Sequence, residues 1–411
     1  MIASLVWAII QLALQVGLIF IPISDQVGAD LQVYLHAAEH FLQRQNLYLQ
    51  GSLAFVEAHY LYAPAFAILF IPFLKLPLQI TLLIHSFLHI AAYCLLFFLW
   101  GKIFQEFHLE KASKMLVRTI PMWLIFSAFW DDLLYVNIYT FMALIATLFI
   151  LAILRENHLS ASIWLTLMLV TKPQWAILAL VPLLLGRYKF FLKLVGGAII
   201  GYAVICVITI LASTPGYVIN QYREQFQFLA RLSRDYPWRG PDTGFLGYNH
   251  SIKQIIVFFT GITSTNLWLA DILKYILCIP LGVVVIWYLI HPVHRTGEQL
   301  PQSTLELSFL LYLGAFLWLD LVWEITLGIV IFTYLLSVVN RQFEKILILS
   351  VFIPYGAVDI WRVLAYAFGS PLVNESYVAW DFSAYVPIII IVLLMFYAIL
   401  IKRLWPKRAI P

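Results

Sequence analysis

Apolar stretches, each close to the length of a membrane-spanning helix, follow one another along almost the whole chain. A helix that crosses a bilayer needs about 20 mostly apolar residues, because it rises about 1.5 Å per residue through a hydrocarbon layer about 30 Å thick. The 411 residues are 63% hydrophobic and only 11% charged, with a mean hydropathy of +0.91. This composition predicts an all-α polytopic membrane protein, and it excludes a cytosolic enzyme, a disordered chain and a nucleic-acid-binding protein.

Proline, glycine and charge clusters divide the chain into about twelve candidate spans. These are residues 4–22, 79–103, 114–130, 136–154, 159–172, 173–186, 190–212, 268–290, 304–318, 321–338, 346–366 and 383–402. The first lacks the basic start and the small-residue cleavage site of a signal peptide, so we expect a retained anchor. The whole chain, 1–411, is expected to form a single integral membrane domain.

The distribution of Lys and Arg predicts the orientation of these spans. Basic residues concentrate in one set of short connections, at 102–118, 155, 187–193, 295, 341–345 and 402–408. By the positive-inside rule, that face is cytoplasmic and carries both termini. The expected location is the inner (cell) membrane. The opposite face then carries two long polar segments, 23–78 and 213–267, where we expect the chemistry.

Residues 29–45, within the first long segment, have the pattern of an amphipathic helix. One side of that helix carries Leu31, Tyr34, Ala38 and Phe41, and the other side is polar. We expect it to lie along the membrane interface. The stretch 60–77 is apolar but interrupted by proline, which predicts a second interfacial or re-entrant helix.

Ionisable side chains are costly at a membrane boundary and are therefore candidates for function. Those on or near the external ends of the expected helices are Asp25, Asp30, Asp131, Asp132, Lys172, Asp320, Glu324, Asp359 and Arg362. Their convergence on one side predicts a polar cavity that opens outward. The alternative is simple contact with lipid headgroups or water.

Two of these charges suit specific roles. Asp30 follows Gly28 at the start of the amphipathic helix, a position that keeps a carboxylate ionised and suits either a general base or an N-cap. Lys172 lies at a break between two apolar segments, just before Pro173. A lysine there suits either a phosphate contact or a side chain that snorkels toward the interface.

The second long segment interleaves arginines, among them Arg239, with aromatic residues. This pattern suits an anionic headgroup beside a sugar face, and it is also typical of an interfacial loop. The run GYNHSIKQ adds Asn249, His250 and Ser251 as hydrogen-bonding groups. We predict neither a cofactor nor a metal site, because nucleotide-binding motifs, CxxC pairs and a third ligand near His85 and His89 are all missing from the sequence. A divalent ion at Asp25, or at Asp131 and Asp132, is the alternative.

Several segments, in a fixed order, resemble glycosyltransferase family 87, the polyprenol-phosphate-mannose-dependent mannosyltransferases of the GT-C superfamily. They are ADLQVY followed by NLY, then YAPAFAILFIPFLKLP, YVNIYTFMALIATLFIL, TKPQWAILALVPLLLGRYK and NHSIKQ. The resemblance implies a GT-C-like helical bundle with a cavity beside the two external segments. It also implies transfer of a hexose, usually mannose, from a polyprenyl-phosphate sugar on the extracytoplasmic face, with inversion at the anomeric carbon.

The resemblance also implies roles for individual residues. The aspartate of the family's DLxVY-like segment corresponds to Asp30, the general base, and Tyr34 in the same segment is placed with the substrate. The lysine of the KPQ-like segment corresponds to Lys172, facing the donor phosphate. Asn249 and Ser251 match an NQS-like segment that here has His250 in the middle.

Two departures bear on the substrate. Where the family often has GQxN, this chain has LYVN and retains only Asn137. A family segment often followed by paired histidines corresponds to VWEITLG, which places Glu324 near a histidine position. Glycosyl transfer is therefore a firmer expectation than mannose.

The expected partners are a polyprenyl-phosphate sugar donor, a glycolipid or glycan acceptor, and membrane lipid. Two other functions fit a chain of this kind. One is a transporter or flippase for a lipid-linked glycan, which favours functional groups near the bilayer midplane. The other is a glycan ligase or polymerase that uses a diphosphate-linked donor.

Overall fold

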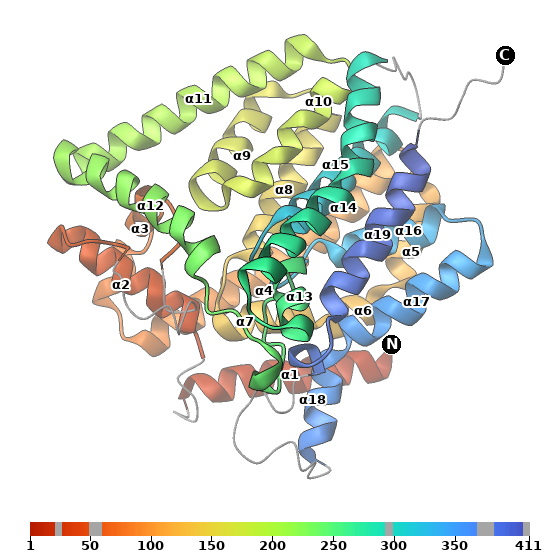
Figure 1. Cartoon of the computed structure of the whole chain (residues 1–411), viewed down its shortest axis with the longest axis horizontal. Coiled ribbons are helices and arrows are strands. Elements are labelled where there is room, and N and C mark those ends of the chain that lie inside the picture. Colours follow the sequence, from red (N-terminus) through yellow and green to blue (C-terminus); the bar gives the residue numbers. More distant parts are fainter. Residues whose placement is uncertain (21–26, 49–59, 292–298, 368–381, 406–411) are drawn as a thin grey trace.

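The computed structural model describes residues 1–20, 27–48, 60–291, 299–367 and 382–405, and every regular element within these ranges is a helix (Figure 1). This confirms the all-α prediction. Four helices are long and apolar enough to cross a membrane: α1 (Ile2–Phe20), α4 (Leu78–Glu106), α11 (Tyr188–Leu211) and α14 (Ser264–Ile290). A fifth candidate is a bent pair, Ile120–Tyr135 and Tyr139–Leu154, in which the chain bends by 115° at the break.

The predicted count of about twelve spans is not confirmed by the described residues. One reason is that some apolar stretches are divided into short helices. The stretch 114–130 falls across α5 (Glu110–Arg118), α6 (Ile120–Ile125) and α7 (Ser127–Tyr135). In the stretch 321–338 only α16 (Gly328–Val338) is helical. Within the described residues, apolar composition therefore predicts more long helices than the structure contains.

The remaining elements complete the bundle. Those before residue 240 are α2 (Ala29–Gln43), α3 (Pro64–Ile68), η2 (Ile71–Lys75), α8 (Tyr139–Leu154), α9 (His158–Thr171), η3 (Pro173–Ala179), α10 (Leu180–Leu184) and α12 (Pro215–Asp235). Those after it are η4 (Pro241–Thr243), α13 (Ile252–Thr260), α15 (Gln299–Trp318), α17 (Gln342–Gly356), α18 (Val358–Ala367), η7 (Phe382–Ala384) and α19 (Ile388–Leu404).

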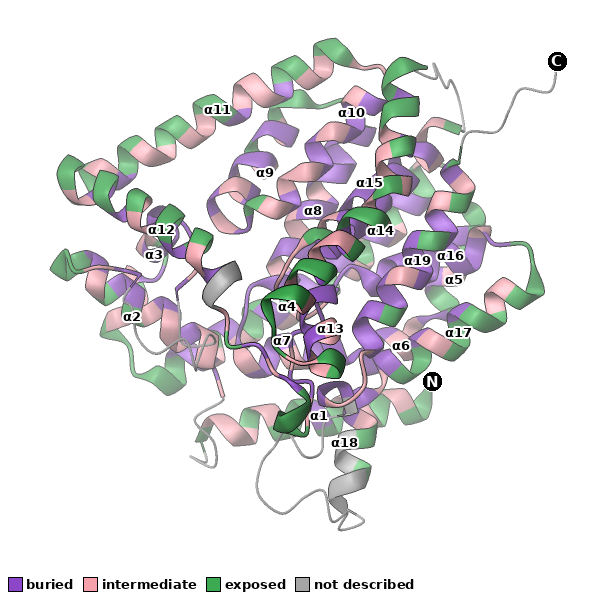
Figure 2. Ribbon diagram, viewed as in Figure 1, coloured by how far each residue is buried: buried purple, intermediate pink, exposed green. Residues whose placement is uncertain are grey.

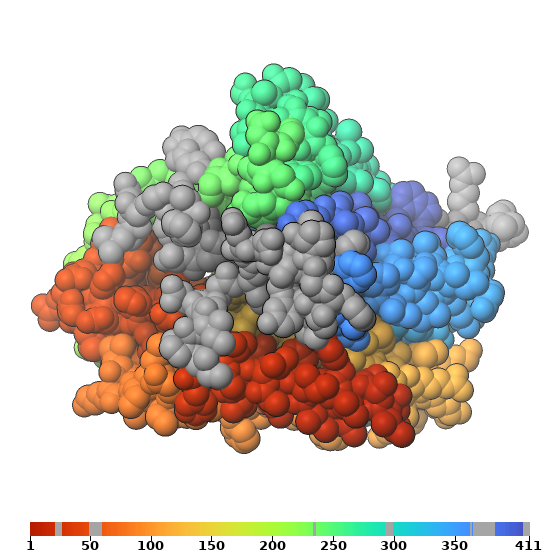
Figure 3. Space-filling model, turned by 90° about the horizontal axis from the view of Figure 1, so that it is seen from below, coloured from red at the N-terminus to blue at the C-terminus, as the bar shows by residue number. Residues whose placement is uncertain are grey.

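The core lies around α8, α15, α16 and α19, which are buried along most of their length (Figure 2). In contrast, α11 buries only three of its side chains. It lies across the top of the view in Figure 1, and α1 lies along the opposite edge. Figure 3 shows the red atoms of α1 exposed along that edge. Apolar side chains exposed on such helices fit contact with lipid.

Close contact between α9 and α11 depends on small residues. A Cβ atom on Gly197 would lie 2.4 Å from the Ser162 hydroxyl oxygen, and one on Gly201 would lie 2.5 Å from that of Thr166. The two hydroxyls donate hydrogen bonds across the interface, to the carbonyl oxygens of Leu194 at 3.0 Å and Ala198 at 3.3 Å. This contact fixes α9, and with it the break that follows α9.

The two long polar segments differ from their predictions in part. The amphipathic helix predicted over 29–45 is confirmed as α2, which ends at Gln43, and Leu31, Tyr34, Ala38 and Phe41 are all buried. The stretch 60–77 does not form one interfacial helix, because its prolines divide it into α3 and η2. The segment 213–267 is largely helical and contains α12, which leads from α11 toward α13 (Figure 1).

A candidate active site between the external segments

A tight turn at Gly28 places Asp30 in the first turn of α2. Gly28 has φ +67° and donates its backbone N–H to the carbonyl oxygen of Leu134 at 2.8 Å. A Cβ atom there would lie 2.2 Å from the Leu82 side chain, so the turn requires glycine on two counts. Because Gly28 is the N-cap, the alternative in which Asp30 caps the helix is wrong.

Asn137 orients the Asp30 carboxylate. The Asn137 Nδ2 atom donates to Asp30 Oδ2 at 2.8 Å, while the Asn137 Oδ1 atom accepts the backbone N–H of Ile138 at 2.7 Å. This second bond fixes which end of the amide faces Asp30. The carboxylate is therefore held by a donor in the break between α7 and α8.

The break between α7 and α8 presents Asn137 to the site. Val136 has φ +54°, and the buried Asp132 carboxylate accepts the backbone N–H groups of Tyr139 at 3.1 Å and Thr140 at 2.8 Å. Asp132 thus stabilises the start of α8. His89 on α4 contacts the backbone carbonyl of Asn137 and lies 3.8 Å from Asp132. These contacts make the sharp turn a rigid feature.

Two buried tyrosines extend the hydrogen-bond chain from Asp30. The Tyr34 hydroxyl donates to Asn137 Oδ1 at 3.3 Å and lies 2.9 Å from the Tyr62 hydroxyl. Burial raises the pKa of both phenols well above 10, so both remain protonated donors.

Lys172 lies in the break between α9 and η3, where Pro173 takes the first position of the next helix. Its side chain is buried, with Nζ 3.8 Å from the centre of the Tyr139 ring and 5.4 Å from that of Tyr62. Burial lowers the pKa of Lys172 to about 8. In the described part of the chain, no carboxylate forms an ion pair with it.

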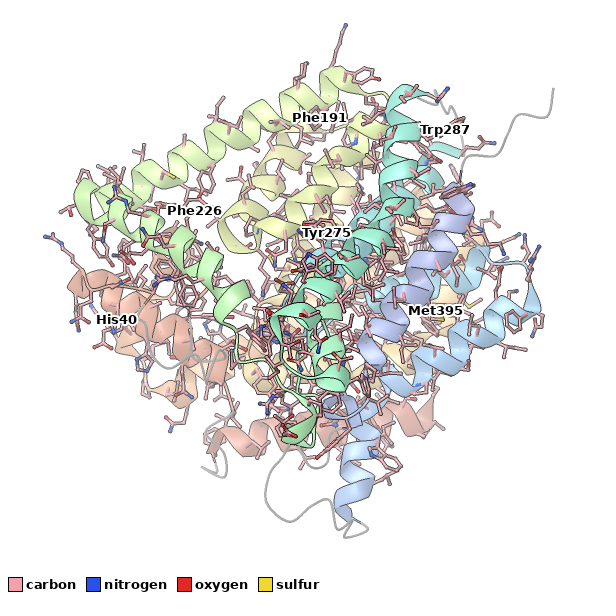
Figure 4. All side chains as sticks on the ribbon, viewed as in Figure 1. His40, Phe191, Phe226, Tyr275, Trp287 and Met395 are labelled. Atoms are coloured by element: carbon pink, nitrogen blue, oxygen red, sulfur yellow. The ribbon has the colours of Figure 1, made fainter. Side chains whose placement is uncertain are left out.

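Tyr62, Tyr139 and Lys172 line a cavity of about 520 Å³, which we call the main cavity. Its other polar residues include Thr171, Gln174, Gln225, Lys253, Asp271, Lys274 and Asp320. Its apolar rim includes Leu229, Tyr275 and Trp318, which are 37%, 57% and 49% exposed. Tyr275 lies on α14 (Figure 4). The main cavity therefore joins a charged interior to an apolar, exposed edge.

Two lysines and two aspartates form a cluster in this cavity. Lys253 Nζ lies 3.0 Å from Asp271 Oδ1 and 3.1 Å from Asp320 Oδ2. Lys274 Nζ also contacts Asp320 and lies 3.7 Å from Asp271. The four charges sum to zero, so Lys172 gives the lining a formal charge of +1.

Several predicted site residues contact the segment 320–322, which forms part of the cavity wall. Asn249 donates to the backbone carbonyl of Asp320 at 2.9 Å and accepts the backbone N–H of Val322 at 3.1 Å. Ser251 caps α13, and His250 is fully buried, with its backbone N–H bonded to Val322. These three residues position the segment that carries Asp320.

Two other predicted residues lie apart from Lys172. The Arg239 guanidinium lies 4.2 Å from the centre of the Phe245 ring, in a separate, smaller cavity. The Glu324 carboxylate accepts the Tyr355 hydroxyl at 2.7 Å, in the segment between α15 and α16.

The predicted convergence of boundary charges holds for Lys172 and Asp320, which share the main cavity, and for Asp30, which reaches it through hydrogen bonds. Asp359 lies elsewhere, beside Ser127. Asp25 and the side chain of Arg362 lie outside the described residues.

The sequence reasoning missed Tyr62, Tyr139, Asp271 and Lys274. A signal for the last two was present, because a Lys and an Asp three residues apart in an otherwise apolar helix are costly unless partnered. Over the described ranges, His, Cys, Asp and Glu side chains form no group of three or more that would bind a metal ion.

No curated protein matches the chain. The model of glycosyltransferase family 87 matches residues 60–319, which include Asn137, Lys172 and most of the main-cavity lining. The match covers more than half of the 411 residues. The chain is therefore a member of glycosyltransferase family 87, a family of membrane glycosyltransferases.

Proposed function

We propose that this membrane glycosyltransferase moves a hexose, with mannose as the first candidate, from a polyprenyl-phosphate sugar to an extracytoplasmic glycolipid or glycan. The observation that carries the proposal is the placement of Lys172 in the main cavity, next to the hydrogen-bonded chain that leads from Tyr62 to Asp30. A cation for the donor phosphate thus lies in the main cavity, and a chain of hydrogen bonds connects the cavity wall to a base for the acceptor hydroxyl.

The formal charge of the cavity supports a monophosphate donor. A polyprenyl-phosphate sugar is a phosphodiester with one negative charge, whereas a diphosphate-linked donor has two. Lys253 and Lys274 are already paired with Asp271 and Asp320, which leaves Lys172 to match a single negative charge. This balance favours the transferase over a ligase that uses a diphosphate-linked glycan.

The apolar rim supports a lipid-linked donor. Leu229, Tyr275 and Trp318 line the main cavity and are also exposed at the surface of the bundle. A polyprenyl chain that leaves the cavity past these side chains would remain in contact with apolar surface. Aromatic residues of this kind are common at the level of the headgroups.

In the proposed reaction, Asp30 takes the proton of the acceptor hydroxyl as its oxygen attacks the anomeric carbon. The new glycosidic bond forms as the bond from that carbon to the phosphate oxygen breaks, and the phosphate leaves with the electron pair. Attack opposite the leaving group gives inversion. Asn137 holds the base by its hydrogen bond, and Lys172 stabilises the departing phosphate.

The reaction as proposed uses no cofactor or metal ion, because a phosphate stabilised by a buried ammonium is already a good leaving group. Asn249, His250 and Ser251 are proposed as positioning residues, since their contacts hold the cavity wall. Arg239 is not assigned to the donor phosphate, because it lies outside the main cavity.

We propose that the site faces outward and that both termini are cytoplasmic. The helix α8 supports this orientation, because Tyr139 at its start lines the main cavity and the basic Arg155 follows its end. Sixteen helical residues separate these ends by about 24 Å, close to the thickness of the hydrocarbon layer.

The test is sugar transfer in proteoliposomes from radiolabelled polyprenyl-phosphate mannose to an extracted glycolipid and glycan pool. Asp30→Asn keeps the size of the side chain but removes the base, so we expect transfer to fall by about 10² to 10⁴. Glu39→Gln, on the exposed side of the same helix, is the matched control and should retain activity. Equal transfer by wild type and a folded Asp30→Asn variant would refute the role of Asp30.

A further inference from the structure

A smaller cavity of about 240 Å³, here called the side cavity, adjoins the main cavity. The two share Tyr236 and Trp323 in their linings. The side cavity is also lined by Trp238, Arg239, Tyr248, Asn249 and Gln254, among others. Its volume is below the roughly 300 Å³ at which pockets for drug-sized ligands begin, so it suits one small ring and not a lipid chain.

Among the residues that the structure describes, the indole N–H of Trp238 has no hydrogen-bond partner, although Trp238 is only 8% exposed. The ring is held in place by Tyr236, whose centre is 4.6 Å away, and it lies 5.7 Å from Lys253 Nζ. Buried donors are nearly always paired, so an orphaned one in a cavity wall requires an explanation. The atom is buried in the wall, so a ligand oxygen in the side cavity pairs with it once the indole shifts toward that cavity.

Arg239 is a second donor, and its position is rigid. Its guanidinium lies over the Phe245 ring, and its backbone N–H and carbonyl are both bonded to the Gln254 side chain, at 3.1 Å and 2.9 Å. Gly247 leaves room for it, since a Cβ atom there would lie 2.7 Å from Arg239 Nε. A fixed fork of donors beside aromatic rings matches a sugar, which has hydroxyl groups around a ring with apolar C–H faces.

We propose that the side cavity binds the second sugar unit of the acceptor, next to the unit whose hydroxyl reacts. This inference rests on the proposed function, because it places donor phosphate and reacting sugar in the main cavity. The shared residues Tyr236 and Trp323 then lie at the glycosidic bond between the two acceptor units. The acceptor is accordingly a glycan of at least two sugars.

The experiment compares the affinity of the purified full-length protein for methyl glycosides of mannose and glucose and for their α-linked disaccharides. Calorimetry in detergent measures binding without a donor. We expect at least one disaccharide to bind about 10-fold or more tightly than its monosaccharide. Trp238→Phe, which keeps a ring but removes the N–H, should weaken disaccharide binding by about 3- to 10-fold and leave monosaccharide binding unchanged.

Trp268→Phe, on the exposed part of α14, is the matched control. Arg239→Gln serves as a second variant if Trp238→Phe does not fold. It should also reduce the preference for the disaccharide over its monosaccharide. Equal affinity for every disaccharide and its monosaccharide would overturn the inference, and so would equal weakening of both by the variants. A disaccharide preference that depends on Trp238, without transfer from polyprenyl-phosphate mannose, would support the side cavity and count against the proposed donor.

Discussion

Replacement of Lys172 by methionine is expected to lower the rate of sugar transfer without lowering the stability of the fold. Methionine has a similar length and no charge, so the variant fills the same space between the Tyr62 and Tyr139 rings. Burial lowers the pKa of Lys172 to about 8, which means that the fold disfavours its charged form. We therefore expect the melting temperature of Lys172→Met to equal or exceed that of the wild type.

The expected loss of activity follows from Coulomb's law. An ammonium about 4 Å from a phosphate, at an effective dielectric constant of about 20, gains roughly 4 kcal/mol. A charge-assisted hydrogen bond is worth about 1.5–3 kcal/mol by mutational measurement. A loss of about 2 to 4 kcal/mol corresponds to a fall of about 30- to 1,000-fold in kcat/KM for the donor.

The assay is initial-rate transfer in proteoliposomes with the donor concentration varied. Lys189→Met removes an exposed lysine at the start of α11 and should leave kcat/KM unchanged. A fall of less than about 5-fold for folded Lys172→Met would refute the assignment of the donor phosphate to Lys172.

Four further outcomes are expected. The wild-type kcat/KM for the donor falls as pH rises through about 8, because Lys172 loses its proton, whereas Lys172→Arg retains its rate to higher pH in the same assay. Treatment with EDTA leaves the rate of transfer unchanged, and a loss restored by Mg²⁺ or Mn²⁺ would contradict the metal-free reaction. Tyr34→Phe removes the hydrogen bond to Asn137 and lowers kcat by about 2- to 10-fold with the donor KM unchanged, as steady-state rates will show. Gly197→Ala destabilises the α9–α11 contact by about 1–3 kcal/mol, because the new Cβ would overlap the Ser162 side chain. Gly196→Ala is the control, since no atom lies within 4 Å of its new Cβ, and thermal unfolding in detergent compares the two variants.

Periodicity and composition predicted the parts of the fold that depend on local pattern. The helix α2 begins where predicted and ends two residues earlier, and its predicted apolar side is buried, because helical spacing alone decides which residues share a face. The long helices α4, α11 and α14 were also found, within a few residues at each end. Long apolar segments without internal breakers leave few alternatives to a helix.

The cavity could not be predicted in the same way, because it depends on contacts between distant segments. Asp30 and Asn137 are 107 residues apart in the sequence, and no local pattern indicates that they meet. The break that presents Asn137 relies on Asp132 as an internal cap and on His89 from another helix. The residues Tyr62 and Lys274 were missed for the same reason, since their roles depend on partners supplied by tertiary structure.

The charge cluster of the main cavity also constrains how the protein is made. Lys274 lies within the apolar helix α14, and a lysine at the centre of an inserting helix costs about 2.5–3.5 kcal/mol. Asp271, one turn earlier, emerges from the ribosome before it and provides an immediate partner. Asp320 is synthesised 46 residues later, which is about 2 to 9 seconds at ordinary rates of translation. The helix α14 thus enters the bilayer as a self-paired segment, and its lysine acquires its second carboxylate only after the whole of α15 has been translated.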